Sequence, residues 1–148
     1  MLNKELILDS LIQHQEEIIK DFDMLLKRYL VAADIDEEDT KDIEDYARQG
    51  ISTDMVHSAE LQLIQAKNDL LILKNLDISI KEAISPGAVV ITDKYNFCIS
   101  VANHSFKVDG KEFIGLAFDS PIYQYMRLMA EGEKFSFNKQ EYLIKEVY

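Results

Sequence analysis

The residues of this chain best suited to chemistry are carboxylates gathered in one run, residues 33–45. Eight of its thirteen residues are Asp or Glu, and one is Lys. Clustered carboxylates can bind Mg²⁺, usually with water and a substrate phosphate completing the coordination shell. In two-metal phosphodiester sites they hold one of the ions. The run supplies no pocket of its own, so this chemistry needs a partner. A charge run of this kind is also typical of a solvated loop.

The other candidates for chemistry are expected to be structural. His14, His57 and His104 are scattered, and none has a Cys or His at a metal-ligand spacing. Cys98 lies in an apolar stretch, which favours a small core residue over a nucleophile. The sequence contains no phosphate-loop, dinucleotide or nucleophile-elbow motif. We therefore expect no self-contained active site and no intrinsic cofactor, so the chain is not predicted to be an enzyme.

Two amphipathic helices must position the acidic run. The first is predicted from Leu2 to about Ala32, a stretch without Gly or Pro. Its apolar residues recur at steps close to three and four, interrupted by Gln15, and the second helix repeats this spacing. The two stripes are Leu8, Leu11, Ile18, Phe22, Leu25 and Tyr29, followed by Val56, Ala59, Leu63, Ala66, Leu70 and Leu73. The pattern predicts an antiparallel helical hairpin over residues 1–79.

The turn of this hairpin is predicted inside the acidic run. The second helix is expected to end near 75–77, so the midpoint of the pair is residue 39 and the tip lies near 34–45. In that register Gln15 faces Leu63. Thr40 could also cap a short helix through Ala47, followed by a break at Gly50. The outgoing arm is then either one kinked helix or two pieces.

The rest of the chain, residues 80–148, is predicted to be a small α+β domain. Ser85-Pro86-Gly87 marks its start, and Ser120-Pro121 marks a helix expected to cover Ile122 to about Ala130. Asp109-Gly110 indicates a hairpin turn, and Asn138-Lys139 joins the last two strands. The strands are expected at 88–92, 97–102, 111–118, 135–137 and 142–147.

Charge and composition limit the possible partners. Residues 1–79 carry a net charge of −10 and residues 80–148 a net charge of −1. Because phosphate contacts dominate nucleic-acid affinity, the acidic half is a poor direct binder of DNA or RNA. No apolar run is long enough to span a membrane, and the N-terminus has no signal-peptide pattern. With its single cysteine, the chain is expected in the cytoplasm, as a monomer or weak homodimer.

The plan of an acidic-tipped hairpin followed by a β-rich domain resembles the bacterial GreA/GreB transcript cleavage factors. The motif match lies in the last thirty residues, and the architecture extends it to the whole chain. The family ends with a Ser-Pro-Ile-Gly helix, a Gly-Asp-Glu turn and a last strand of the Ile-Lys-x-Val/Ile-x-Tyr kind. The matching residues here are Ser120-Pro121-Ile122, Gly132-Glu133 and Ile144-Lys145-Glu146-Val147.

The resemblance implies a function for each part. The C-terminal domain would be FKBP-like and would dock at the rim of the RNA polymerase secondary channel, through Asp119, Ser120, Pro121 and Ile122. The coiled coil would enter the channel. Acidic tip residues would then help bind Mg²⁺ shared with the polymerase active site, so that the polymerase cleaves backtracked RNA. The tip candidates are Asp36, Glu37, Glu38 and Asp39, together with Asp54.

The sequence departs from the family in three places. Tyr123 replaces the glycine after Ser-Pro-Ile, and Leu128-Met129 replaces a Gly-Lys pair. The family tip reads roughly Gly-Asp-Leu-x-Glu-Asn-x-Glu-Tyr, whereas the stretch from Gly50 keeps only Asp54, in the second acidic position. Two other functions therefore stay open: a non-cleaving regulator that occludes the channel, and a coiled-coil dimerisation or adaptor protein. Prolyl isomerase activity ranks below these, because a fold does not carry a function by itself.

Overall fold

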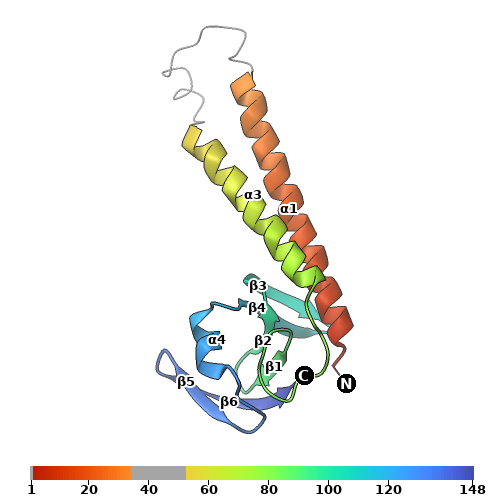
Figure 1. Cartoon of the computed structure of the whole chain (residues 1–148), viewed down its shortest axis with the longest axis vertical. Helices are drawn as coiled ribbons and strands as arrows, with labels where there is room; N and C mark the ends of the chain where they lie inside the picture. The colour runs from red at the N-terminus through yellow and green to blue at the C-terminus, as the bar shows by residue number, and fades with distance from the viewer. Residues whose placement is uncertain (1, 35–52) are drawn as a thin grey trace. The chain divides into compact units, whose positions relative to one another are not determined.

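The computed structural model describes residues 2–34 and 53–148, and its architecture is α+β (Figure 1). Two long helices pack as a hairpin and are followed by a six-stranded mixed sheet with one short helix. This confirms the predicted fold class at that level. The helices are α1 (Lys4–Asp34), α3 (Thr53–Lys74) and α4 (Pro121–Met126). The strands are β1 (Val89–Thr92), β2 (Asn96–Ser100), β3 (Asn103–Val108), β4 (Lys111–Ala117), β5 (Lys134–Phe137) and β6 (Gln140–Val147).

The chain divides into two compact units. One comprises Gln13–Leu70, which is most of the helical hairpin. The other comprises Met1–Ile12 and Leu71–Tyr148, so the first turns of α1 and the last turn of α3 belong with the sheet. The sequence division into 1–79 and 80–148 stays a prediction. The predicted tip acids Asp36, Glu37, Glu38 and Asp39, and the short helix from Thr40 to Ala47, lie outside the described residues.

The hairpin unit is held by the predicted stripes. Ala59, Leu63 and Ala66 of the predicted second stripe are buried on α3. Gln15 is only 3% exposed, and its Nε2 donates a hydrogen bond to the Ala66 carbonyl at 2.9 Å. The predicted register placed Gln15 opposite Leu63, one turn of α3 away from this acceptor. The polar interruption in the first stripe is thus a buried, satisfied amide.

The sheet has the strand order β3-β4-β2-β1-β6-β5. β2 and β4 are parallel, and the other neighbours are antiparallel. Side chains alternate between its two faces, as the pleat requires. In β2, Phe97 and Ile99 belong to one core cluster and Cys98 to the other. Because both faces of β1 and β2 are covered, these strands are apolar except at their ends, where Thr92, Asn96 and Ser100 lie.

Each face of the sheet has its own core. One face packs with the α4 helix, through Tyr123 and Met126. The other face packs with Ile7 and Leu11 of α1 and Leu73 of α3. Ile7, Leu11 and Leu73 are at most 1% exposed, so the ends of the two long helices form part of the sheet domain's own core.

Both predicted hairpin turns are confirmed. Asp109 and Gly110 have φ values of 51° and 79°, and Asn138 and Lys139 have φ values of 49° and 63°. Two successive positive φ values define the type I′ turn, whose twist matches that of the flanking strands. Asp, Gly and Asn tolerate this conformation.

The predicted end of the short helix was wrong. The helix was expected to reach about Ala130, but α4 ends at Met126. The following backbone pairs with a distant segment instead: Leu128 N donates to Ile84 O, and Ile84 N donates to Met129 O, both at 2.8 Å. Leu128 takes a φ of +65° to make this turn. The sequence prediction also missed β3, an edge strand with the polar sequence NHSFKV.

Candidate functional site

The predicted docking residues lie at the start of α4. Ser120 occupies the N-cap position and Pro121 begins the helix, as predicted, although the Ser120 hydroxyl makes no capping hydrogen bond. The backbone fixes the turn. Ser120 N donates to Ala117 O at 3.0 Å, and Ser120 O accepts from Gln124 N at 3.2 Å. The Gln124 side chain also donates to Phe118 O at 2.8 Å. The segment is therefore held in one conformation.

The predicted docking residues differ in accessibility. Asp119 and Pro121 are exposed, and Ser120 is half-buried. Ile122 is half-buried as well and packs against the core cluster between the sheet and α4. Asp119 and Pro121 are thus available to a partner, whereas Ile122 contributes to folding. Tyr123, which replaces the family's glycine, is 4% exposed and belongs to the same core.

Sequence reasoning missed three exposed apolar side chains in the same segment. Phe118, Tyr125 and Leu128 are 37%, 61% and 68% exposed. We call Phe118, Pro121, Tyr125 and Leu128 the α4 surface. The Tyr125 ring meets Phe137 of β5 edge-on, with ring centroids 5.5 Å apart. The spacing of Pro121 and Tyr125 on one helix face was a usable signal, and a helix continued to Ala130 would have placed Leu128 on the same face.

Asp54 is the only predicted tip residue that the structure describes. It lies exposed in the first turn of α3, where a carboxylate is favoured by the helix dipole. It lines a shallow recess of about 290 Å³ together with Leu25, Tyr29 and Met55. Among residues 2–34 and 53–148, no group of three or more His, Cys, Asp or Glu side chains could hold a metal ion. Asp54 alone does not make a metal site, because Mg²⁺ takes several oxygen ligands.

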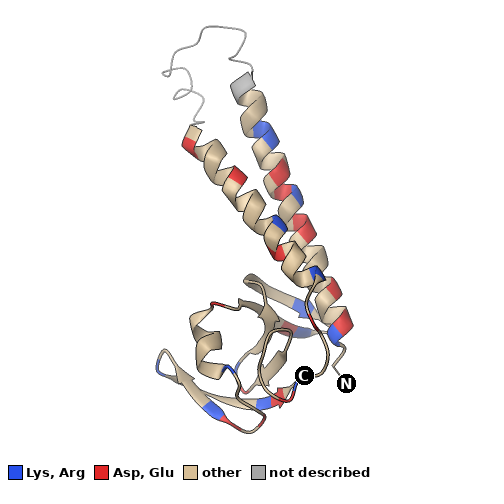
Figure 2. Cartoon of the chain, in the orientation of Figure 1, with Lys and Arg blue, Asp and Glu red and all other residues tan. Residues whose placement is uncertain are grey.

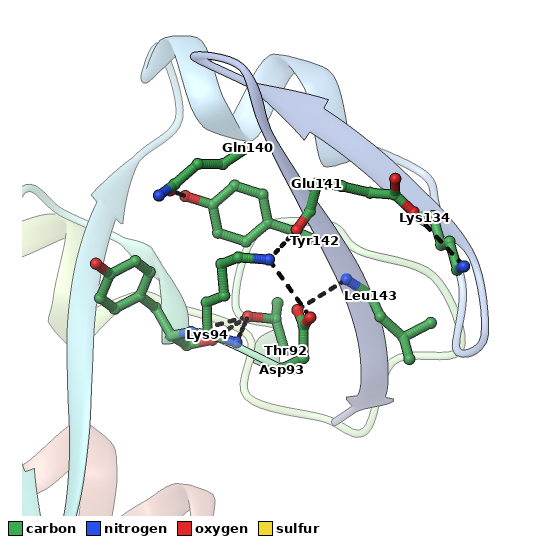
Figure 3. A network of polar contacts seen from close by, with 9 residues as sticks. Thr92, Asp93, Lys94, Lys134, Gln140, Glu141, Tyr142 and Leu143 are labelled. Carbon is green, nitrogen blue, oxygen red and sulfur yellow. Dashed lines mark hydrogen bonds and ion pairs between the residues drawn. The ribbon is translucent and has the colours of Figure 1, made fainter.

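A polar network of nine residues is structural (Figure 3). It ties the turn between β1 and β2 to β6. Asp93 Oδ1 accepts a hydrogen bond from Leu143 N at 2.9 Å, and this bond is the main cause that lowers the pKa of the Asp93 carboxyl. Thr92 Oγ1 donates to Tyr95 O at 2.6 Å. Lys94 Nζ contacts the Glu141 carbonyl and lies 5.1 Å from the centre of the Tyr142 ring. These contacts join the turn between β1 and β2 to β6, so the network serves the fold.

The remaining candidates for chemistry are accounted for by packing or exposure. Cys98 is 4% exposed, and burial raises the pKa of its thiol to about 11, which confirms the predicted core role. His57 and His104 are exposed and His14 is half-buried. The aromatic rings of Phe97, Phe135 and Tyr142 are core side chains.

Charged side chains lie on both the helices and the sheet part of the described chain (Figure 2). Figure 2 shows Asp and Glu on both long helices. In the described part of the chain, no helix is long and apolar enough to cross a membrane. No protein-family model, curated protein or solved structure matches this chain.

Proposed function

We propose that this chain is an RNA polymerase-binding transcription elongation factor similar to GreA/GreB. The observation that carries the proposal is the helical hairpin and the charge of the residues that join its helices. α1 ends at Asp34 and α3 begins at Thr53. The residues between them include seven Asp or Glu and two Lys or Arg. A rigid helix pair that presents carboxylates suits insertion into a channel that contains metal ions.

The dimensions of the hairpin support this use. α1 has 31 residues and is therefore about 46 Å long at 1.5 Å per residue. The interior of the helix pair is filled by small and medium side chains such as Ala59, Leu63 and Ala66. Each helix has a diameter of about 10 Å with its side chains.

Docking would involve the α4 surface. An exposed cluster of large apolar side chains on a soluble domain marks an interaction site more often than chance. Tyr125 and Leu128 are more than half exposed, and they follow Asp119 and Pro121 in the segment that resembles the family's docking region. Aromatic residues near the centre of an interface commonly carry most of its binding energy.

The chain would contribute ligands rather than a complete active site. Mg²⁺ at the polymerase active centre would supply the phosphodiester chemistry. The tip carboxylates Asp36, Glu37, Glu38 and Asp39, with Asp54, would add negative charge and oxygen ligands beside it. The altered spacing of these acids favours a second candidate with the same docking: a regulator that occupies the channel without stimulating cleavage.

Pull-down with purified core RNA polymerase from the source organism tests the docking. We expect wild type to retain polymerase, and the double variant Tyr125→Asp/Leu128→Asp to lose at least about tenfold in retention. Ile80→Asp is the matched control, because Ile80 is 77% exposed and lies outside the α4 surface. Equal retention of polymerase by wild type and the double variant would rule out the α4 surface as the docking site. Ile122→Asp is a poor test, because Ile122 packs against the core.

Transcript shortening in backtracked complexes separates the two candidates. The quadruple variant Asp36→Asn, Glu37→Gln, Glu38→Gln and Asp39→Asn keeps the docking residues intact. A cleavage factor gives metal-dependent shortening with wild type and none with the quadruple variant. Binding by both proteins without shortening by either identifies the channel-occluding regulator.

A further inference from the structure

α3 carries a second apolar stripe on the face turned away from α1. Its inner stripe, Ala59, Leu63 and Ala66, is buried in the hairpin. On the outer face, Leu61 and Ile64 are 53% and 55% exposed, and His57 and Asn68 are exposed on either side of them. Positions 57, 61, 64 and 68 alternate in steps of four and three, the spacing of a coiled-coil seam. We call these four residues the outer seam.

We propose that the outer seam pairs with the outer seam of a second copy of this chain, with the two α3 helices antiparallel. In this register Leu61 of each copy packs on Ile64 of the other. His57 of each copy then lies opposite Asn68 of the other. Apolar residues meet apolar residues at the centre, and polar residues that can hydrogen-bond meet at both ends of the seam.

The charges beside the outer seam are complementary in this register. Glu60 and Lys67 are exposed and directly precede Leu61 and Asn68, so both lie on the same side of the seam. In an antiparallel pair, residues on this side face one another. Glu60 of each copy therefore faces Lys67 of the other, which gives two ion pairs and no contact between like charges.

Other arrangements of two copies fit less well. Sliding the antiparallel pair by one heptad lets Leu61 meet Leu71, which is 58% exposed. It also places Lys67 against Lys67 of the other copy, and Ile64 against Asn68. A parallel pair places Glu60 near Gln65, so that neither charge finds an opposite partner. The charges of Glu60 and Lys67 thus select one register among those that the spacing allows.

The size of the outer seam sets the expected affinity of the dimer. A tight interface buries about 800 Å² per partner, and this seam offers two large apolar side chains from one helix face. We therefore expect a weak, reversible dimer with a dissociation constant of about 10–100 µM. This inference goes beyond the proposed function and does not depend on it, because it concerns the outer face of α3 and not the α4 surface.

Sedimentation velocity of the full chain between 5 and 500 µM tests the pairing. We expect a monomer–dimer equilibrium for wild type, and a monomer at all concentrations for Ile64→Glu. Met24→Glu is the matched control: it makes the same change at a 45% exposed residue of α1 and should dimerise like wild type. A wild type that stays monomeric at 500 µM overturns the proposal, as does an Ile64→Glu variant that dimerises normally.

A charge exchange tests the register with variants that leave the core intact. Glu60→Lys alone and Lys67→Glu alone should each raise the dissociation constant about tenfold, because each replaces two attractions by two repulsions. The double variant Glu60→Lys/Lys67→Glu should return to within about threefold of wild type. If the double variant loses as much dimer affinity as the two single variants together, the antiparallel register is overturned.

Discussion

Replacing the buried Gln15 by Glu is the sharpest test of how the hairpin packs. Gln15 is 3% exposed, and its Nε2 donates to Ala66 O at 2.9 Å. Gln15→Glu keeps the shape of the side chain but replaces the donor by a carboxylate oxygen. That oxygen then faces a carbonyl oxygen, and a charge is buried without a partner. We expect a loss of about 3 kcal/mol in the free energy of unfolding near pH 7.5.

The loss should depend on pH in a defined direction. Burial raises the pKa of the introduced carboxyl above that of an exposed glutamate. Lowering the pH therefore protonates the folded state first, and the protonated carboxyl can donate to the Ala66 carbonyl again. By linkage, the penalty is full at high pH and shrinks as the pH falls. We expect it to decrease from about 3 to about 1.5 kcal/mol between pH 7.5 and pH 5.5.

Urea unfolding followed by helical circular dichroism at both pH values measures this effect. Gln13→Glu is the control, because Gln13 is exposed on the same helix and should change stability by less than about 0.5 kcal/mol. A Gln15→Glu variant as stable as wild type at pH 7.5 would refute the reasoning. It would mean that Gln15 is not enclosed against Ala66 in solution.

Four further predictions concern the sheet unit. Gly87→Ala should cost about 3 kcal/mol in chemical denaturation, because Gly87 has a φ of +86° and an added Cβ would lie 2.0 Å from the Asp77 carbonyl oxygen. Gly110→Ala, with a φ of +79° but no neighbour within 4 Å, should cost only about 1 kcal/mol. Cys98, whose pKa is raised to about 11 by burial, should react with a thiol reagent at pH 8 at least about 100-fold more slowly in the native state than in urea. Asp93 has a lowered pKa, so its contribution to stability is present above the pKa of an unfolded aspartate and is lost as the pH falls through its folded pKa. Acid titration of Asp93→Asn should therefore show a smaller loss of stability than wild type.

The hairpin and the sheet turns were predictable because their signals are local. The stripes on the two helices repeat with the period of an α-helix, and α3 runs over nearly the predicted range. Asp109-Gly110 carries its turn type in its own sequence. Each of these features depends only on residues that are neighbours along the chain.

The features that were missed depend on residues far apart in sequence. α4 ends early because the backbone of Leu128 and Met129 hydrogen-bonds to Ile84 instead of continuing the helix. Ile84 is distant in sequence, so no local pattern predicts these bonds. β3 lies at the edge of the sheet and buries only Phe106 and Val108, because one of its faces is open to solvent. The partner of Gln15 depends on the register of two helices, which a stripe fixes only to within about one turn.

The candidate site was predictable in part for the same reason. Ser120 and Pro121 are a local start signal for a helix, and the structure places that start as expected. The exposure of Tyr125 and Leu128 depends on which side chains the sheet covers, so it became visible only in the fold. Ile122 was predicted to contact a partner, but in the fold it packs against the chain's own core.

The measurement that tests the central claim most directly is a titration of fluorescently labelled full chain with core RNA polymerase from the source organism. The proposed function predicts saturable binding with a dissociation constant of about 1 µM or lower, and competition by unlabelled wild type but not by Tyr125→Asp/Leu128→Asp. No saturable binding at polymerase concentrations up to about 10 µM, about tenfold above that value, would contradict both the cleavage-factor and the channel-regulator functions.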